Sequence, residues 1–380
     1  MTIEEILAMP EVERKIYYLK KGRKTEQPNA HALYNDWNPN KHEIVIDEEK
    51  YPKIKITTQP EKRITDPTTR KEYVEPAVRK EVDPNRIALP IEQDIVNIQT
   101  AFTVGTEPVL DCQPDQSEES LLSTLKQVFK KNKLKYQNKK VVRAWLAEQE
   151  VAEYWYVVKD DGFWAKLKRK ISGIFGKSKP EYRLKSAIWS PFRGDKLYPF
   201  FNDQGDLVAL SREYKKKDLN DVEITCFMTI TKDMVYQWEL TSNWTDKGSF
   251  AHGFKKMPVI YMYRPEAYCE KIKSLRVRLE KLLSNYADCI DYHFFPILML
   301  FGNVENFSGE FKNRVVELTG QGANAQYLTW SQVPDTVKFE VETLLSQIYG
   351  LTNTPRISFD SLKGTGNAVS GVTFDYVFMS

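Results

Sequence analysis

The longest regular pattern in the chain, EAYCEKIKSLRVRLEKLLSNYADCIDYHF at 266–294, constrains its fold more than any other feature. Apolar residues recur along it every three or four positions, which is the period of an α-helix with one buried face. About 30 residues at roughly 1.5 Å each give a helix about 45 Å long. The apolar stripe consists of Ile272, Leu275, Leu279, Leu282, Leu283, Tyr286 and Ile290. The sequence therefore predicts one long amphipathic helix that ends before Pro296.

A second helix is predicted from Pro334 to about Leu351, since proline is favoured at the first position of a helix. Between the two helices, ILMLFG is typical of a buried strand. Two further short strands, RVVELTG and AQYLTW, are expected in the polar stretch that follows. The two helices therefore flank a small segment that contains strands.

Residues 86–265 mix helical and strand patterns. IEQDIVNIQTAFTVG (91–105) and SEESLLSTLKQVFKKN (117–132) have helical spacing, and KKVVRAWLAEQEVAEYWYVV (139–158) predicts a helix that gives way to a strand. Four strand-like runs follow, and the turn residues between them indicate an antiparallel meander. These runs are GDLVALSREY, VEITCFMTI, DMVYQWELT and MPVIYMY.

Residues 1–85 have the composition of a poor core former. A short helix is predicted after Thr2, whose hydroxyl and Glu5 have the spacing of a capping box. Beyond Leu19 the segment is dominated by Lys, Arg, Glu and Pro, and only KIKI (53–56) alternates like a strand. Such a segment is expected to be an extended arm that lies on a neighbour.

The composition is that of a soluble globular protein, with 41% hydrophobic and 28% charged residues. The formal net charge is only +3, so any contact with nucleic acid must come from local basic patches. The N-terminus carries acids where a signal peptide needs a basic region, and no run approaches the roughly 18–20 apolar residues of a membrane span. The sequence therefore predicts a cytoplasmic protein that does not bind membranes.

Residues that could carry chemistry are scattered. The four cysteines and four histidines include no close pair, so their spacing predicts no metal site. No motif of a serine hydrolase, a metalloprotease or a Walker-type nucleotide site is present. The sequence thus predicts a protein that is not an enzyme and needs no cofactor.

A glycine-containing stretch near the end, TPRISFDSLKGTGNAVSGVTF at 354–374, invites a nucleotide interpretation. A phosphate-binding loop places its lysine after the glycines and follows a strand, whereas Lys363 precedes Gly364 and the preceding element is helical. The dinucleotide fingerprint also fails, because Val369 stands where the third glycine is required. A mobile loop between two helices is therefore favoured over a nucleotide site.

The segment DGFWAKLKRKISGIFGKSKP (161–180) has apolar residues on one helical face and basic residues elsewhere. This pattern is typical of a helix at a membrane surface or of a calmodulin target. An insertion that packs on its parent domain gives the same pattern, and Gly173 and Gly176 weaken the helix. Packing or partner contact is favoured over membrane binding.

The long helix carries basic residues that stand mostly outside its apolar stripe. Charges on a helix are usually solvated, but clustered ones can also approach phosphates without reading base sequence. The candidates are Lys271, Lys273, Arg276, Arg278 and Lys281.

The order of these parts resembles the portal (head-to-tail connector) proteins of tailed bacteriophages, over roughly residues 86–380. The first block is RIALPIEQDIVNIQTAFTVGTEPV, in which a helix leads to a Gly-x-x-Pro turn. The second, GFKKMPVIYMYRPEAYCEKIKSLRVRLEKLLSNYADCIDYHFFPILMLFG, has a Pro-Val strand, a linker, the long helix and a strand. The third is the helix from Pro334 with the glycine loop after it. Their order and spacing together are specific.

The resemblance implies an α+β, portal-like subunit with a mixed α/β wing/body, two long antiparallel stem helices, a small α/β clip and a tunnel loop. The expected segments are an N-terminal arm (1–85), the wing/body (86–265), the first stem helix (266–295), the clip (296–332), the second stem helix (333–353), the tunnel loop (354–367) and the start of a long helix that the chain cuts short (368–380). In the tunnel loop, the resemblance implies DNA-channel residues Arg356, Lys363, Gly364, Gly366 and Asn367.

Portals form homo-oligomeric rings, commonly of about twelve subunits, at one vertex of the virion capsid. The resemblance therefore implies assembly in the host cytoplasm and passage of double-stranded DNA without sequence specificity. It also implies docking of the terminase large subunit, a head-completion or adaptor protein, and the major capsid or scaffold protein. The alternative left open is a peripheral membrane or nucleic-acid-binding adaptor that uses residues 163–179, and a nucleotide-dependent enzyme comes third.

Overall fold

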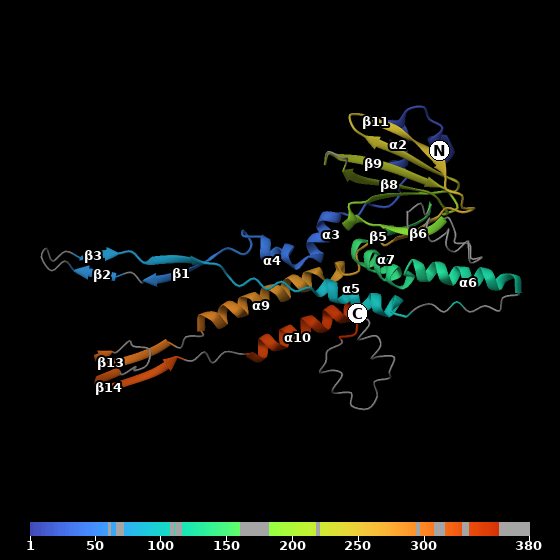
Figure 1. The fold of residues 1–380 in the computed structure, drawn as a ribbon. Coiled ribbons are helices and arrows are strands. Elements are labelled where there is room, and N and C mark those ends of the chain that lie inside the picture. Colours follow the sequence, from blue (N-terminus) through green and yellow to red (C-terminus); the bar gives the residue numbers. More distant parts are fainter. Residues whose placement is uncertain are drawn as a thin grey trace, which may run out of the picture. The chain divides into compact units, whose positions relative to one another are not determined.

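The chain mixes helices and strands in two compact units, so the α+β class holds at this level (Figure 1). The computed structural model describes residues 1–59, 62–65, 72–106, 110, 116–159, 182–217, 221–293, 297–307, 316–328 and 334–356. The first unit comprises residues 1–38, 90–271 and the chain from 352 onward. The second comprises residues 39–89 and 272–351.

A five-stranded antiparallel sheet is the centre of the first unit. Its strands follow chain order, β11-β10-β9-β8-β7, which confirms the predicted meander for GDLVALSREY, VEITCFMTI and DMVYQWELT. The prediction is wrong for MPVIYMY, which pairs in a different sheet. The five strands are β7 (Lys196–Phe201), β8 (Leu207–Lys217), β9 (Glu223–Thr231), β10 (Met234–Leu240) and β11 (Trp244–Ala251). A second, three-stranded sheet has the order β12-β5-β6, from β12 (Val259–Tyr263), β5 (Glu150–Lys159) and β6 (Tyr182–Trp189).

The five-stranded sheet is covered on both faces. Side chains alternate across a strand, so Phe227 joins a cluster with Leu19 while its neighbour Met228 joins one with Trp189. The first cluster contains residues of helices α1 (Ile3–Leu7) and α2 (Val12–Lys21). The second contains residues of the three-stranded sheet. Burial on both faces explains the near-continuous apolar run in β9.

The N-terminal residues are folded, which differs from the extended arm expected over 1–85. The predicted capping box is present, because Glu5 N–H donates to Thr2 Oγ1 at 3.3 Å and Thr2 N–H donates to Glu5 Oε2 at 2.8 Å. The prediction is wrong for residues 1–37, which form α1, α2 and α3 (Ala30–Trp37). Two residues of α1, Ile3 and Ile6, and two of α2, Ile16 and Leu19, are buried in the core among many charged neighbours in the sequence. The charged composition of this segment therefore gives no indication of its few buried apolar residues.

A buried ion pair fixes the chain after α2. Arg23 lies 2.7 Å from the Glu150 carboxylate, and both side chains are almost fully buried. Tyr261 O–H donates to the same carboxylate at 2.9 Å, and Arg23 also donates to backbone carbonyls at Thr25 and Glu26. Burial raises the pKa of Glu150, and the Arg23 charge opposes that rise. A buried charge is tolerated only when it is paired and hydrogen-bonded in this way.

Three helices complete the first unit; two have nearly the predicted bounds, and the third begins five residues before the predicted start at Lys139. They are α5 (Ile91–Val104), α6 (Gln116–Lys131) and α7 (Leu134–Glu148). Val141 and Ala144 of α7 pack against Val151 and Ile188 of the three-stranded sheet. A short 3-10 turn, η2 (Pro191–Arg193), lies between β6 and β7.

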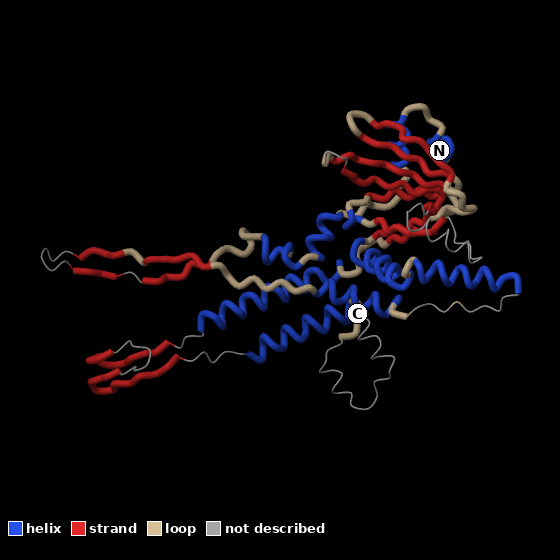
Figure 2. Tube along the Cα trace, in the orientation of Figure 1, coloured by secondary structure: helices blue, strands red, loops and turns tan. Residues whose placement is uncertain are grey.

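The second unit contains the long helix, α9 (Lys273–His293), beside α10 (Pro334–Leu351). The two helices run in opposite directions and are joined through a two-stranded antiparallel sheet of β13 (Ile297–Phe307) and β14 (Val316–Leu328) (Figure 2). α10 has the predicted bounds. α9 begins later than predicted, because residues 270–272 form the 3-10 turn η3 (Glu270–Ile272).

The remaining elements of the second unit precede α9 in sequence. They are η1 (Pro39–Lys41), α4 (Glu43–Ile46) and two short antiparallel ribbons, β1 (Ile54–Gln59) with β4 (Val78–Val82) and β2 (Lys62–Thr65) with β3 (Glu72–Glu75). The two short strands predicted after ILMLFG are one continuous strand, β14. Within the described parts of 296–332 the structure has strands and no helix. The expected α/β clip stays a prediction, because residues 308–315 and 329–332 lie outside the described residues.

Candidate nucleic-acid interface

Helix α9 has two different long faces. Positions three or four apart on one face are exposed, namely Ser274, Arg278, Lys281, Asn285 and Cys289. The opposite face contains buried Arg276, Leu279, Glu280 and Ser284. A helix turns by about 100° per residue, so the exposed positions form a single stripe. This stripe is available to a partner outside the unit.

The buried face of α9 is held by an extended segment, 85–89, which we call the strap. Alternate backbone N–H groups of the strap donate to side chains one helical turn apart on α9. Leu89 N–H donates to Glu280 Oε1 at 2.9 Å and Ile87 N–H donates to Ser284 Oγ at 2.9 Å. Asn85 N–H donates to Asp288 Oδ1 at 2.8 Å. The strap thus runs antiparallel to the helix with a fixed register.

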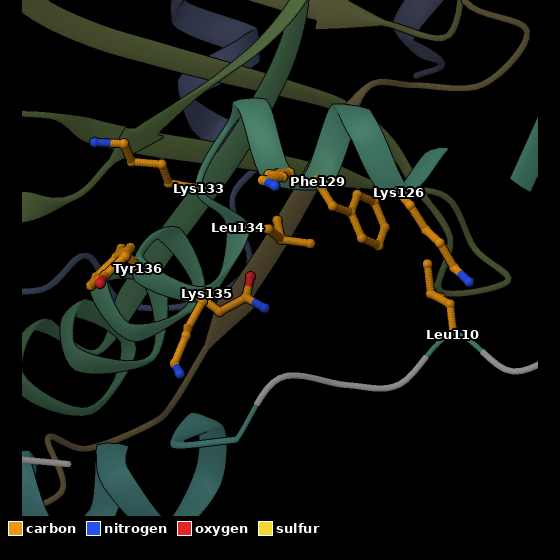
Figure 3. A pocket seen from close by; sticks show the side chains of 9 residues that line it. Leu110, Lys126, Phe129, Lys133, Leu134, Lys135 and Tyr136 are labelled. Atoms are coloured by element: carbon orange, nitrogen blue, oxygen red, sulfur yellow. The ribbon is translucent and has the colours of Figure 1, made fainter. Parts of the chain in front are cut away.

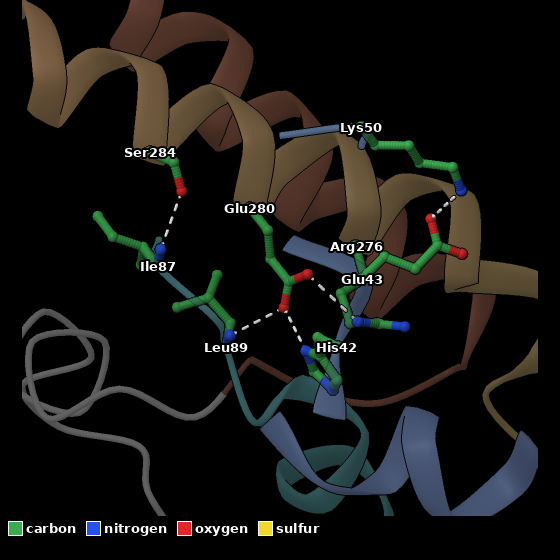
Figure 4. Close-up of polar contacts among 8 residues, drawn as sticks. All are labelled: His42, Glu43, Lys50, Ile87, Leu89, Arg276, Glu280 and Ser284. Atoms are coloured by element: carbon green, nitrogen blue, oxygen red, sulfur yellow. Dashed lines mark hydrogen bonds and ion pairs between the residues drawn. The ribbon is translucent and has the colours of Figure 1, made fainter. Parts of the chain in front are cut away.

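The carboxylate of Glu280 is the centre of this contact (Figure 4). Besides the strap N–H, its Oε1 lies 2.6 Å from His42 Nδ1, and its Oε2 accepts from Arg276 at 3.2 Å. His42, Arg276 and Glu280 are each no more than 2% exposed. Removing one partner from a buried charged pair costs roughly 3–5 kcal/mol, because the other charge is left in a low-dielectric site. The cluster therefore fixes both the rotation and the axial position of α9.

A second arginine holds the strap from its other side. The guanidinium of Arg86 donates to the carbonyl of Val45 at 2.7 Å and to that of Tyr51 at 2.9 Å. Val45 belongs to α4, so the strap joins α4 to α9. Successive side chains of an extended segment point in opposite directions. The side chain of residue 86 therefore points away from those of residues 85 and 87.

Contact between α9 and α10 includes one ion pair at the surface. Arg278 lies 2.7 Å from the Glu340 carboxylate, with the two side chains 52% and 36% exposed. The buried positions of α10, Leu344 and Ile348, are one helical turn apart. Burial of such residues contributes most of the packing energy, since an exposed ion pair contributes about 0.2–1 kcal/mol.

The structure brings two of the five predicted basic residues of this helix together. Arg278 and Lys281 lie in the exposed stripe of α9. Lys273 is half-buried in the first turn of the helix, and Lys271 is exposed in η3 before it. Arg276 is 1% exposed and ion-paired with Glu280. It cannot approach a phosphate from that position, so Arg276 is not a DNA contact in this structure.

The glycine loop is described only at its beginning. Gln99 donates to Thr354 Oγ1 at 2.9 Å, and Tyr268 O–H donates to the carbonyl of Thr352. Both threonines are buried, and Arg356 after them is exposed. The chain is therefore anchored in the first unit just before the loop. Lys363, Gly364, Gly366, Asn367 and the segment 163–179 lie outside the described residues.

Sequence reasoning missed the residues that orient these elements. Arg276 and Glu280 have the four-residue spacing of a helical ion pair, which is a readable signal. His42 lies 238 positions from Glu280, and Gln99 lies 255 positions from Thr354, so no local pattern reveals them. In the described part of the chain, no three His, Cys, Asp or Glu side chains are grouped as metal ligands. No described helix has the length and apolarity to span a membrane.

Comparison with known families gives one match. The model of the family described as "Phage portal protein, SPP1 Gp6-like" matches residues 41–380. None of the curated proteins compared with the chain matches it. The matched range contains the strap, α9 and α10, and it leaves out α1, α2 and α3. It therefore reaches further toward the N-terminus than the three sequence blocks that carry the resemblance.

Proposed function

Because the chain belongs to the phage portal protein family, we propose that it is the subunit of a ring at one capsid vertex through which double-stranded DNA enters and leaves. The family implies an oligomeric ring at the capsid. Its proteins are structural, and the role proposed here needs no catalytic chemistry. The number of subunits, about twelve by analogy, belongs to the proposal.

The observation that carries the proposal is the exposed stripe of α9. We propose that α9 and α10 are the two stem helices and that Arg278 and Lys281 face the channel, together with Lys271 and Lys273 before them. The tunnel loop would add Arg356, Lys363, Gly364, Gly366 and Asn367. A ring repeats each cation around the channel, so a chain with a net charge of only +3 can still surround DNA with positive charge. Contacts to phosphates alone suit a conduit, because sequence-specific binding would stop translocation.

The ribbon of β1 and β4 supports assembly with other copies. Ile54 is directly opposite Val82 in the register, and Val78 lies on the same face by strand alternation. All three are exposed, at 39%, 38% and 51%. An isolated two-stranded ribbon is marginally stable in water. We propose that a neighbouring subunit covers this apolar face in the ring.

The proposal is tested with Lys281→Glu in a phage that depends on this gene product. Rings should form as in the wild type, because Lys281 is exposed, while the amount of packaged DNA should fall. Lys232→Glu is the matched control, since Lys232 is exposed in the turn between β9 and β10. Equal packaging by both variants would remove the α9 stripe from the proposed channel. Absence of rings from the wild-type chain in electron micrographs would contradict the proposal as a whole.

The docking partners are proposed on the same basis. A ring at a capsid vertex must meet the terminase large subunit during packaging, then a head-completion or adaptor protein, and the major capsid or scaffold protein around it. Assembly is placed in the host cytoplasm and the final location in the virion. The adaptor alternative rests on residues 163–179, and loss of liposome co-sedimentation on Trp164→Glu would favour it.

A further inference from the structure

The junction of α6 and α7 forms a basic hollow of about 570 Å³ in the first unit (Figure 3). Between Glu119 and Glu148 the sequence has eight basic residues and no acidic one. Four of these lysines line the hollow, and no carboxylate is among its described lining residues. The lining comprises Leu110, Lys126, Phe129, Lys130, Lys133, Leu134, Lys135, Tyr136 and Asn138. Among the described residues, the lining of the hollow therefore concentrates positive charge without a carboxylate beside it.

The hollow also has an apolar part. Phe129 and Leu134 are half-buried in it, and Tyr136 is 63% exposed at its side. Phe129 continues an apolar row on α6, in which Leu121 and Leu125 precede it by two turns and one turn. Those two leucines are 71% and 41% exposed. α6 thus presents an exposed apolar row, about 12 Å long, that ends in the hollow.

The lysines are not explained by the helices that carry them. Lysines in the last turn of α6 suit the negative end of its dipole. Lys133 and Lys135 instead stand at the positive end of α7, where cations are unfavourable, and no side chain caps that end. An anionic partner would remove this unfavourable concentration of charge.

We propose that the hollow and the apolar row of α6 together bind an acidic amphipathic segment of a partner protein. Carboxylates of that segment would contact Lys126, Lys130, Lys133 and Lys135, and its apolar side chains would cover Leu121, Leu125 and Phe129. DNA fits less well, because a phosphate backbone gains nothing from an exposed apolar row. This surface is separate from the α9 stripe, so the inference goes beyond DNA conduction and does not depend on it.

The test is fluorescence anisotropy with the purified full chain and a labelled helical peptide of about 16 residues, the length of α6. The peptide has leucines at every fourth position and glutamates elsewhere. Three other probes have the same label: a scrambled peptide of equal composition, a peptide with lysine in place of glutamate, and a DNA duplex. The acidic amphipathic peptide should bind best, and binding should weaken with added salt.

The double variant Lys126→Glu/Lys130→Glu should weaken binding of the acidic peptide by about tenfold or more, since two attractive charges become repulsive. Tyr136→Ala, at an exposed position, should weaken it several-fold through the lost apolar contact. The control is Lys131→Glu/Lys140→Glu, because both lysines are exposed nearby and neither lines the hollow. The control should bind as the wild type does.

Two results would overturn the inference. Equal binding of the scrambled peptide would show that the apolar row plays no part. Tighter binding of the duplex, lost in the same double variant, would assign the hollow to nucleic acid instead. Neither result depends on ring formation or packaging, so failure here is distinguishable from failure of the proposed function.

Discussion

Helix α9 makes one buried and one exposed ion pair, each with a glutamate. Glu280 faces Arg276 at 3.2 Å with both side chains at most 2% exposed, whereas Glu340 faces Arg278 at 2.7 Å with both partly exposed. The substitutions Glu280→Gln and Glu340→Gln remove the same charge at nearly constant shape. Coulomb's law at contact distance would favour the shorter, exposed pair, so burial alone decides the expected order.

The magnitudes follow from burial. Glu280→Gln leaves the Arg276 charge in the interior, which costs about 3 kcal/mol. Glu340→Gln should cost about 0.5 kcal/mol, since water solvates Arg278 when its partner is lost. Because 1.36 kcal/mol is a factor of ten, the first substitution should speed local opening of the strap about 100-fold and the second about twofold.

Hydrogen–deuterium exchange of the amides of Ile87 and Leu89 measures this opening directly. Both N–H groups donate to α9 side chains, so their exchange requires the strap to leave the helix. Exchange elsewhere, in the five-stranded sheet of the first unit, should remain at the wild-type rate in both variants. Equal acceleration by the two substitutions would refute the reasoning that burial of the ion pair holds the strap.

Three further predictions concern the first unit. Burial raises the pKa of Glu148 to about 7, so between its ordinary pKa and 7 the folded protein holds a proton that the unfolded chain has released, and stability falls as the pH rises through that window. Melting between pH 5 and pH 8 should therefore show a loss on the order of 2–3 kcal/mol that Glu148→Gln abolishes, and an unchanged pH profile in the variant would contradict this. Gly22→Ala should lower the melting temperature, because its Cβ would overlap the ring of Phe200, and an unaltered melting temperature would exclude that contact. Gln99→Ala should speed tryptic cleavage after Arg356 by removing the donor to Thr354, and a wild-type cleavage rate would show that Gln99 does not hold the loop base.

The sequence predicts the elements whose pattern is periodic. The meander follows from alternating strands with clear turns, and Gly205, with φ of +88°, stands in the left-handed region that one such turn requires. Both ends of α10 follow from Pro334 and from the loss of apolar period after Leu351. These features are local, so one window of sequence contains the information.

Other features depend on contacts between distant residues. Arg276 counts as polar in any periodicity argument, yet it lies inside because the carboxylate of Glu280 neutralises it. The helices of residues 1–37 look like a charged arm until Ile6 and Leu19 meet the sheet. The division into stem, clip and tunnel loop came from the family resemblance rather than from any pattern in the residues.

The N–H groups of the strap and their acceptors on α9 are spaced at slightly different intervals. Two residues of extended chain advance about 6.6 Å, while one turn of four helical residues advances about 6.0 Å. This difference of about 0.6 Å from one hydrogen bond to the next is small over the three hydrogen bonds of Asn85, Ile87 and Leu89. In a longer strap the accumulated difference would exceed the range of hydrogen-bond lengths. Because the three acceptors are one helical turn apart, a shift of α9 by less than a turn would break all three hydrogen bonds at once. The strap thus holds α9 at the axial position in which all three backbone N–H groups meet side-chain acceptors.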